Sequence, residues 1–283
     1  MKDNKIKYNQ EELICNYIQK GRIPWTSGYL EYRNSEIKKV LTDDESIENF
    51  KKGIVPKGFG FKLDERIIEY TWLFTILRKG NLKVLDAGST FNHDFILENE
   101  IFSDKSLSIL TLSPEPKNFN EKGISYIYDD MRDIPFKSEY FDIVVSQSTI
   151  EHIGMNNSIY GSSTQYNPGK KTKSYEYIIA VKELLRILKP KGKLLITFPY
   201  GTFENHDFFQ QFDEEMVERI VTLLSVEGNV KKNYFKYLKN GWIFSKKEHC
   251  DNCKSFNPHT GIGKGDDGAA HSRSICCIEF DKN

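Results

Sequence analysis

The sequence has no charge excess of either sign, because 40 lysine and arginine residues balance 40 aspartate and glutamate residues. A protein that binds nucleic acid without reading the nucleotide sequence needs a strong positive electrostatic field. The balance of charges therefore argues against nucleic acid as a partner. No apolar run is long enough to span a membrane, and residues 1–20 lack the apolar core of a secretory signal. We therefore expect a cytoplasmic protein without a membrane span.

The chain also has few cysteines, five in 283 residues. An odd number in a chain of this length favours free thiols over a disulfide framework. Cys250 and Cys253 have the spacing of half a zinc site, which Cys276 and Cys277 would nominally complete. Adjacent residues on a strand face opposite ways, however, so the last two cannot easily bind one ion. We expect buried thiols and no metal.

The amino-acid composition is typical of a globular protein, with 39% hydrophobic and 13% aromatic residues. Strands are expected at 82–86, 107–112, 124–128, 141–146, 192–198, 230–238 and 274–280, and helices at 11–20, 44–51, 64–78, 175–188 and 213–225. Strands that alternate with helices predict an α/β fold, with a mostly parallel, doubly wound sheet covered on both faces. We expect residues 1–63 to form a helical, irregular extension and 64–283 the α/β domain, with a polar loop insertion at 154–172.

The loop after the first predicted strand is the first candidate site. It reads Asp86-Ala87-Gly88-Ser89-Thr90, and ligands of open α/β sheets bind at the carboxyl ends of the strands. Gly88 would let the backbone turn sharply and approach a ligand, and Asp86 can accept hydrogen bonds. The dinucleotide fingerprint G-x-G-x-x-G is not met. On this segment alone, a tight strand-to-helix turn explains the residues equally well.

Further segments follow in a recognisable order: V-L-D-A-G at 84–88, D-D-M-R-D-I-P-F at 129–136, F-D-I-V at 141–144, E-H at 151–152 and R-I-L-K-P-K-G at 186–192. The sequence here resembles class I S-adenosylmethionine-dependent methyltransferases, over roughly residues 64–200. The resemblance implies a Rossmann-like, seven-stranded sheet with an antiparallel last strand, and S-adenosyl-L-methionine as cofactor.

The resemblance also implies a set of cofactor-binding residues, namely Asp86, Gly88, Ser89, Thr90, Asp130, Met131 and Ser146. Those of the first loop would hold the methionine part. Asp130 would receive the adenine amino group, Met131 would cover the ring, and Ser146 would face the sulfonium. The chain departs from the family where Thr90 and Asn92 replace later glycines. It also lacks a carboxylate at the end of the second strand, for which Glu115 is either the substitute or a solvated turn residue.

His152 is the candidate general base, since a hydroxyl acceptor must lose its proton and histidine titrates near neutrality. It follows the fourth predicted strand, and Glu151 beside it would raise its pKa. A structural role for His152 is the alternative. Two other histidines, each with an aspartate that could orient it, are further candidates for the general base: His206 with Asp207, and His93 with Asp94. The segment 146–149, Ser-Gln-Ser-Thr, lacks the carboxylate cluster of metal-dependent relatives, so we expect no metal requirement.

The acceptor is suggested only by a looser resemblance. The segment Gly28-Tyr29 and the predicted helix with Arg66, Glu69 and Tyr70 come before the first strand. In this respect the sequence resembles methyltransferases of bacterial surface-polysaccharide clusters. This resemblance implies a small-molecule, sugar or sugar-nucleotide acceptor and O-methylation. RNA or protein methylation, or a non-catalytic cofactor-binding scaffold, remain open, and the chain is compatible with a homo-oligomer. Several aromatic residues are either core or an acceptor wall: Trp25, Tyr29, Phe203, Phe208 and Phe209.

Overall fold

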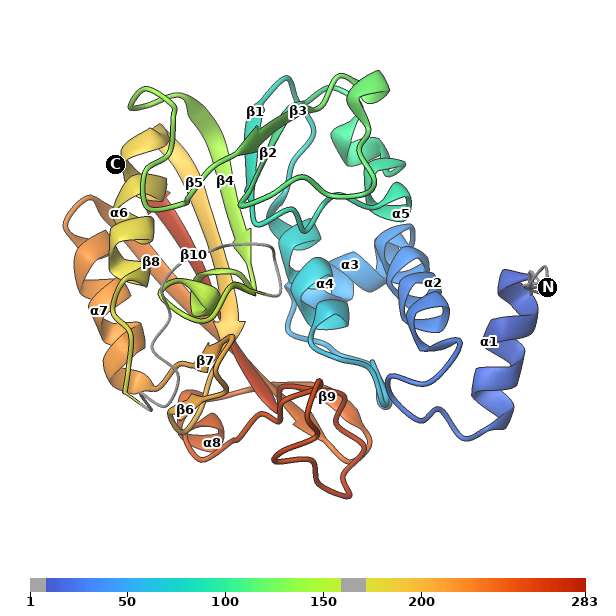
Figure 1. Cartoon of the computed structure of the whole chain (residues 1–283). Helices are drawn as coiled ribbons and strands as arrows, with labels where there is room; N and C mark the ends of the chain where they lie inside the picture. Colours follow the sequence, from blue (N-terminus) through green and yellow to red (C-terminus); the bar gives the residue numbers. More distant parts are fainter. Residues whose placement is uncertain (1–8, 159–171) are drawn as a thin grey trace, which may run out of the picture.

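The computed structural model describes residues 9–158 and 172–283. In this part of the chain an eight-stranded mixed sheet has the order β3-β2-β1-β4-β5-β10-β8-β9, shown in Figure 1. Its strands are β1 Lys83–Ala87, β2 Ser106–Thr111, β3 Ser125–Tyr128, β4 Phe141–Gln147, β5 Leu188–Pro199, β8 Gly228–Leu238, β9 Gly241–Ser245 and β10 Ser274–Lys282. A short separate hairpin pairs β6 Glu204–Asn205 with β7 Gln210–Gln211.

The sheet has a parallel half and an antiparallel half. Strands β3, β2, β1, β4 and β5 run parallel, whereas β10 is antiparallel to both β5 and β8. This arrangement confirms the Rossmann-like fold with an antiparallel closing strand. The expected count of seven is wrong by one, because β9 pairs along the outer edge of β8.

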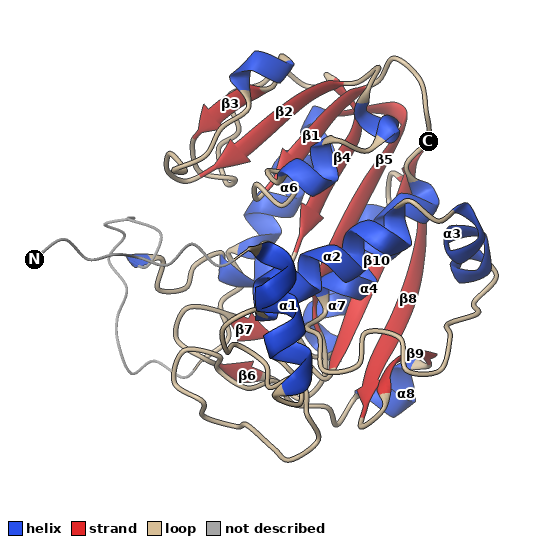
Figure 2. Cartoon of the chain, turned by 90° about the vertical axis from the view of Figure 1, so that its right-hand side faces the viewer, coloured by secondary structure: helices blue, strands red, loops and turns tan. Residues whose placement is uncertain are grey.

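Helices cover both faces of the sheet. They are α1 Gln10–Gln19, α2 Tyr29–Leu41, α3 Asp44–Lys51, α4 Arg66–Ile76, α5 Asp94–Leu97, α6 Tyr177–Ile187, α7 Glu214–Ser225 and α8 Lys247–Cys250, with short 3-10 turns η1 Glu100–Phe102, η2 Asn120–Lys122 and η3 Ile150–His152. Figure 2 shows α1, α2 and α4 in front of the sheet. In Figure 1, α6 and α7 lie on the other side.

Two apolar clusters fill the space between the helices and the sheet. Val84 and Val145 belong to the cluster beneath α2, α3 and α4, whereas their neighbours Leu85 and Val144 belong to the cluster beneath α6 and α7. Such alternation follows from the two-residue period of a strand. A strand buried on both faces therefore reads as a continuous apolar run, as 84–85 and 143–145 do.

The N-terminal helices share the first cluster with α4. Asn9 caps α1 in a capping box with Glu12, and Arg33 of α2 forms a 2.7 Å ion pair with Asp64, next to the start of α4. Helix α2 was not anticipated from the sequence. The domain boundary after residue 63 stays a prediction, and the insertion at 154–172 lies mostly outside the described residues.

The buried cysteines face different ways, as the strand pattern predicted. Cys277 packs in the cluster on the α4 side of the sheet, and Cys276 in the cluster on the α6 side. Cys250 and Cys253 are buried free thiols. In residues 9–158 and 172–283, no helix is long and apolar enough to cross a membrane.

Candidate active site

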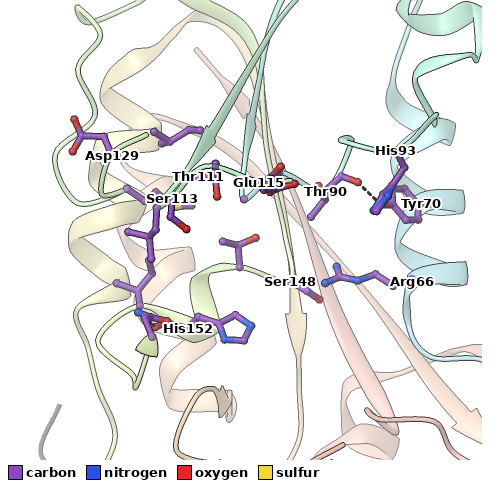
Figure 3. A pocket seen from close by; sticks show the side chains of 18 residues that line it. Arg66, Tyr70, Thr90, His93, Thr111, Ser113, Glu115, Asp129, Ser148 and His152 are labelled. Atoms are coloured by element: carbon purple, nitrogen blue, oxygen red, sulfur yellow. Dashed lines mark hydrogen bonds between the residues drawn. The ribbon is translucent and has the colours of Figure 1, made fainter. Parts of the chain in front are cut away.

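A pocket lies at the carboxyl ends of β1, β2, β3 and β4, with a cavity volume of about 310 Å³. This is the place at which open α/β sheets bind ligands, and the volume is at the lower end of small-molecule sites. Figure 3 shows side chains entering it from α4, from the strand ends and from η3. Six of the predicted site residues line it: Gly88, Ser89, Thr90, Glu115, Met131 and His152. Asp86, Asp130 and Ser146 are not among the lining residues.

Asp86 is used to shape the first loop. The side chain is fully buried, and its carboxylate accepts hydrogen bonds from the Thr90 amide (3.2 Å), the Thr90 hydroxyl (2.9 Å) and the Phe91 amide (2.7 Å). Burial raises its pKa to about 6, against the effect of these donors. In the structure Asp86 holds Thr90 at the pocket wall. A direct contact of Asp86 with the cofactor stays a prediction.

Gly88 brings this loop against the loop after β4. A Cβ added to Gly88 would lie 2.0 Å from Oγ1 of Thr149, and its φ of +132° suits glycine. Ser89 follows in the left-handed region at φ 60°. The buried Oγ of Ser89 has no hydrogen-bond partner among the described residues, although Ser89 lines the pocket. Buried hydroxyls are normally satisfied, so this one fits a site that holds a polar ligand.

Glu115 is held in place by Asn92, one of the residues that replace the family's glycines. The Asn92 side-chain amide donates to Oε2 of Glu115 (2.6 Å) and to the carbonyl of Lys117 (3.0 Å). Its oxygen in turn accepts from the hydroxyl of Tyr126 (2.7 Å). Asn92, which stands where the family has a glycine, therefore orients the Glu115 carboxylate that lines the pocket beside β2.

The acid after β3 that lines the pocket is Asp129, where the sequence suggested Asp130. The Asp130 carboxylate is engaged by Arg132, with Nε at 3.0 Å and Nη2 at 2.5 Å, and this pairing lowers its pKa against the effect of burial. The Asp129 amide bonds to the Thr111 carbonyl of β2 (3.1 Å), which continues the sheet one residue past β3. Successive strand residues face opposite sides, so Asp129 lines the pocket and Asp130 does not.

The end of β4 shows a similar shift. Ser146 is fully buried in the sheet and does not line the pocket, whereas Ser148 and Thr149 do. Ser148 has a positive φ of 41°, unusual for a residue other than glycine. Its hydroxyl donates to Oε1 of Glu69 on α4.

Glu69 gathers groups from three elements, and the sequence pattern did not identify it as a site residue. It accepts hydrogen bonds from Arg66 Nη1 (3.1 Å), Thr197 Oγ1 (2.6 Å) and Gln147 Nε2 (3.3 Å), besides Ser148. The side chain is fully buried, and burial raises its pKa despite the charge of Arg66. This carboxylate therefore ties α4 to the ends of β4 and β5.

His152 of η3 lines the pocket and has a defined tautomer. Its Nδ1 lies 2.7 Å from the carbonyl oxygen of Phe208, so Nδ1 carries the proton and Nε2 the lone pair. Burial, followed by the positive charges of Arg66 and His271, lowers its pKa to about 4 against the effect of the Phe208 carbonyl. The expected upward shift is wrong, because burial of the imidazole lowers the His152 pKa. Burial also raises the pKa of Glu151 itself well above its usual range.

The alternative bases take different positions. His206 stacks on Phe209 at 4.5 Å, does not line the pocket, and has Glu204 (3.5 Å) as its nearest acid in place of Asp207. His93 does line the pocket, at a position exposed to solvent. Asp94 is occupied by an ion pair with Lys117.

The aromatic residues proposed as an acceptor wall are not pocket-lining. Tyr29 and Phe209 are each only 1% exposed, so they belong to the hydrophobic core and not to an acceptor wall. Trp25 donates to the Ala270 carbonyl (2.5 Å) in the segment before β10. In the same segment, His271 bonds to Glu65 at 2.5 Å.

Comparison with known proteins agrees with this geometry. Residues 102–196, from η1 into β5, match the family described as methyltransferase domain. No curated protein matches the sequence.

Solved structures with a similar fold include three methyltransferases. The N-methyltransferase NodS from Bradyrhizobium japonicum, in complex with S-adenosylhomocysteine, is 12% identical, with a TM-score of 0.43 over 88% of this chain and 98% of that one. A putative sarcosine dimethylglycine methyltransferase from Galdieria sulphuraria is 14% identical, with a TM-score of 0.48 over 85% and 99%. The 1,6-didemethyltoxoflavin-N1-methyltransferase from Burkholderia thailandensis is 10% identical, with a TM-score of 0.43 over 92% of each.

A pocket at the carboxyl ends of β1 to β4, in a parallel sheet closed by an antiparallel strand, gives the chain a Rossmann-like α/β fold with a ligand site where such folds have one. Within that fold, residues 102–196 match the methyltransferase-domain family, whose cofactor is S-adenosylmethionine. The Ser89 hydroxyl, which has no partner among the described residues, and the carboxylates of Glu115 and Asp129 suit that cofactor.

Proposed function

We propose that the enzyme methylates a hydroxyl oxygen of a small acceptor, a sugar or sugar nucleotide, with His152 as general base. The observation that carries the proposal is a pair of hydrogen-bond acceptors on one wall of the pocket. His152 lines the pocket, and the hydrogen bond from its Nδ1 to the Phe208 carbonyl puts the lone pair on Nε2. Asn157 lines the same pocket, and its buried Oδ1 has no partner among the described residues. The Asn157 amide donates to the His152 carbonyl at 3.2 Å, which keeps the two residues together.

Two adjacent acceptors suit a ligand that brings hydroxyl hydrogens. S-adenosylmethionine supplies an electrophilic methyl group. As the new oxygen–carbon bond forms and the carbon–sulfur bond breaks, the hydroxyl proton passes to Nε2 of His152. A positioned base of this kind typically contributes about 10²–10⁴-fold to the rate. The lowered pKa keeps the imidazole neutral, and so able to accept a proton, across the physiological pH range.

Polar side chains near His152 support a hydroxyl-rich acceptor. Ser148, Thr149 and Asn157 line the pocket on the β4 side, and Ser113 lines it opposite them. Figure 3 shows His152 and Ser148 beneath the row formed by Thr111, Ser113 and Glu115. The balanced charge of the chain gives no support to an RNA acceptor.

For the cofactor, we propose contacts from each strand end. The loop of Gly88, Ser89 and Thr90 would bind the methionine part, Glu115 the ribose hydroxyls, and Asp129 the adenine amino group. Met131, which is 5% exposed and lines the pocket, would cover the ring. This assignment replaces Asp130 and Ser146 by Asp129 and Ser148.

The test is methyl transfer from isotopically labelled S-adenosylmethionine to a panel of sugars and sugar nucleotides, with RNA, peptides and primary amines as comparison acceptors. We expect label in an O-methyl ether, identified by mass spectrometry and NMR. Label only on nitrogen, or only on RNA or protein, would contradict the proposal. Cofactor binding without transfer to any acceptor would favour the scaffold function.

A further inference from the structure

A second cleft lies apart from the pocket at the strand ends, and the two share none of the described residues that line them. Its cavity volume is about 510 Å³, which is within the range of small-molecule sites. Its walls come from segments that are distant in sequence: 23–24 before α2, 61–62 before α4, Lys239 between β8 and β9, and 264–268 before β10. In Figure 1 the last of these lies in the loops below β9. The N-terminal extension and the loops of the C-terminal part thus form a second concave site.

Positive charge predominates in this cleft. Three lysines line it, and none of them forms an ion pair with a residue in 9–158 or 172–283: Lys62, Lys239 and Lys264. Of the two carboxylates that line it, Asp267 is paired with Arg273, whose Nε lies 2.5 Å from Oδ2 and whose Nη2 lies 3.2 Å from Oδ1. Asp266 is the other, and it has no such partner in the described chain. The three lysines are therefore opposed by one unpaired carboxylate, and the cleft attracts anions.

A buried tyrosine sets the shape of the cleft. The Tyr237 hydroxyl accepts a hydrogen bond from the Lys62 amide (3.1 Å) and donates one to the Gly268 carbonyl (3.2 Å), and Tyr237 is only 3% exposed. Gly268 has a φ of +76°, and a Cβ added there would lie 3.3 Å from Cγ of Lys62. Contacts beneath the surface therefore hold the two walls close together.

Hydrogen-bond donors are available on both of these walls. Nζ of Lys62 donates to the Gly21 carbonyl (2.7 Å) and lies 5.2 Å from the centroid of the Phe61 ring. An ammonium group has three donors, so Lys62 is oriented by these contacts and still has donors for a ligand. On the other wall, four consecutive backbone amides donate to no acceptor in the described chain: those of Gly265, Asp266, Asp267 and Gly268. Successive amides in turns form anion-binding sites in proteins.

We propose that this cleft binds a nucleoside diphosphate, with its phosphates at the three lysines. Lysine ammonium groups and backbone amides are common partners of phosphate oxygens. Ile23, Pro24 and the half-buried Phe61 ring line the same cleft, and an aromatic ring offers a stacking surface for a base. A ligand with one polyanionic part and one planar part matches these two kinds of wall. The site is separate from the pocket at the strand ends, and the proposal is independent of the methyl transfer proposed above.

The test is calorimetric titration of the whole chain with uridine diphosphate and with uridine, in saturating S-adenosylhomocysteine. The S-adenosylhomocysteine fills the pocket at the strand ends, so binding there does not contribute. We expect uridine diphosphate to bind at least about 10-fold more tightly than uridine, because each charge-assisted hydrogen bond to a phosphate adds to the affinity. Added salt should weaken the binding of uridine diphosphate and leave that of uridine nearly constant.

Three variants locate the binding. Lys239→Gln combined with Lys264→Gln should weaken uridine diphosphate by about 10-fold and leave uridine unchanged. Asp266→Asn removes the unpaired carboxylate, so it should strengthen uridine diphosphate. Lys182→Gln is the control, because Lys182 is an exposed lysine of α6 without an ion pair among the described residues. It should leave both affinities at the wild-type value.

Both lysines of the double variant are exposed, so its thermal melt should match that of the wild type. The proposal is overturned if uridine diphosphate does not bind, if uridine binds equally well, or if the double variant keeps the wild-type affinity. Sedimentation of the protein with anionic phosphatidylglycerol vesicles, without binding of uridine diphosphate, would assign the lysines to a lipid surface and would also overturn it.

Discussion

Gly88 and Thr149 meet at a distance that allows no side chain on Gly88, since an added Cβ would lie 2.0 Å from Oγ1 of Thr149. The contact joins the loop after β1 to the loop after β4, and both residues line the pocket. The glycine of the family pattern is therefore explained here by the packing of two loops. It need not be explained by closeness to the cofactor.

The first prediction follows from this contact. Gly88→Ala should lower the free energy of unfolding by about 1–3 kcal/mol, the usual cost of overpacking, and should weaken S-adenosylhomocysteine. Gly53→Ala is the matched control, because Gly53 also has a positive φ but open space around it. Adding Thr149→Ala to Gly88→Ala should recover part of the loss in chemical denaturation. No recovery would mean that backbone strain alone causes the effect.

The second prediction concerns Glu115. If it binds the ribose hydroxyls, Glu115→Ala should weaken S-adenosylhomocysteine by about 1–3 kcal/mol, the range for a hydrogen bond to a charged group. Asn92→Ala should have a smaller effect in the same direction, since Asn92 acts by orienting Glu115. Glu121→Ala, on the exposed turn η2, serves as the control. Equal affinities for Glu115→Ala and wild type would make Glu115 a solvated turn residue.

The third prediction separates the two acids after β3. Asp129→Asn should weaken adenosine-containing ligands, because Asp129 lines the pocket. Asp130→Asn should change stability more than affinity, since it disrupts the ion pair with Arg132. Titrations and thermal melts of both variants check this. The opposite pattern would restore Asp130 as the adenine contact.

The fourth prediction concerns His152 and pH. A general base must be deprotonated, so a pKa of about 4 predicts that turnover is level above about pH 5 and falls as pH drops through 4. A limb near neutrality, the ordinary expectation for histidine, should be absent. His152→Ala should lower kcat by about 10²–10⁴-fold with the cofactor affinity nearly constant. His206→Ala is the control, and equal losses in both variants would argue for a structural role.

The fifth prediction is a change of stability with pH that follows from the same histidine. His152 has a folded-state pKa of about 4, below the ordinary 6.5. Between these values the unfolded chain binds more protons, so the free energy of unfolding should rise as pH increases from about 4 to 6.5. The slope should be smaller in His152→Gln, measured by chemical denaturation across that window. An unchanged slope would show that the fold does not hold His152 in the neutral form.

The parallel half of the fold could be predicted from the sequence because buried strands give continuous apolar runs and α6 has a clear amphipathic period. Helix α2 was missed because its start, Gly28, caps it through backbone geometry without a side-chain hydrogen bond. Strand β9 was missed because an edge strand needs only β8 as partner. Its five residues carry little pattern of their own.

The site was harder to predict for a related reason. A strand end tells which residues are near the pocket, but the side each one faces changes with a single step along the chain. Asp129 and Asp130, one step apart, illustrate this. The pKa of His152 depends on burial, on the hydrogen bond to the Phe208 carbonyl and on the charge of Arg66, and both of these residues are distant in the sequence. Such contacts leave no local signal.

The position of β10 makes the sheet vulnerable to loss of a single segment. It is the last strand in sequence, yet it lies between β5 and β8 and is their shared neighbour. A chain cut before Ser274 would separate the β8–β9 hairpin from the parallel strands. It would also expose two unpaired edges, on β5 and on β8. Exposed edges pair with other chains, so such a fragment should aggregate even though every residue that lines the pocket is still present.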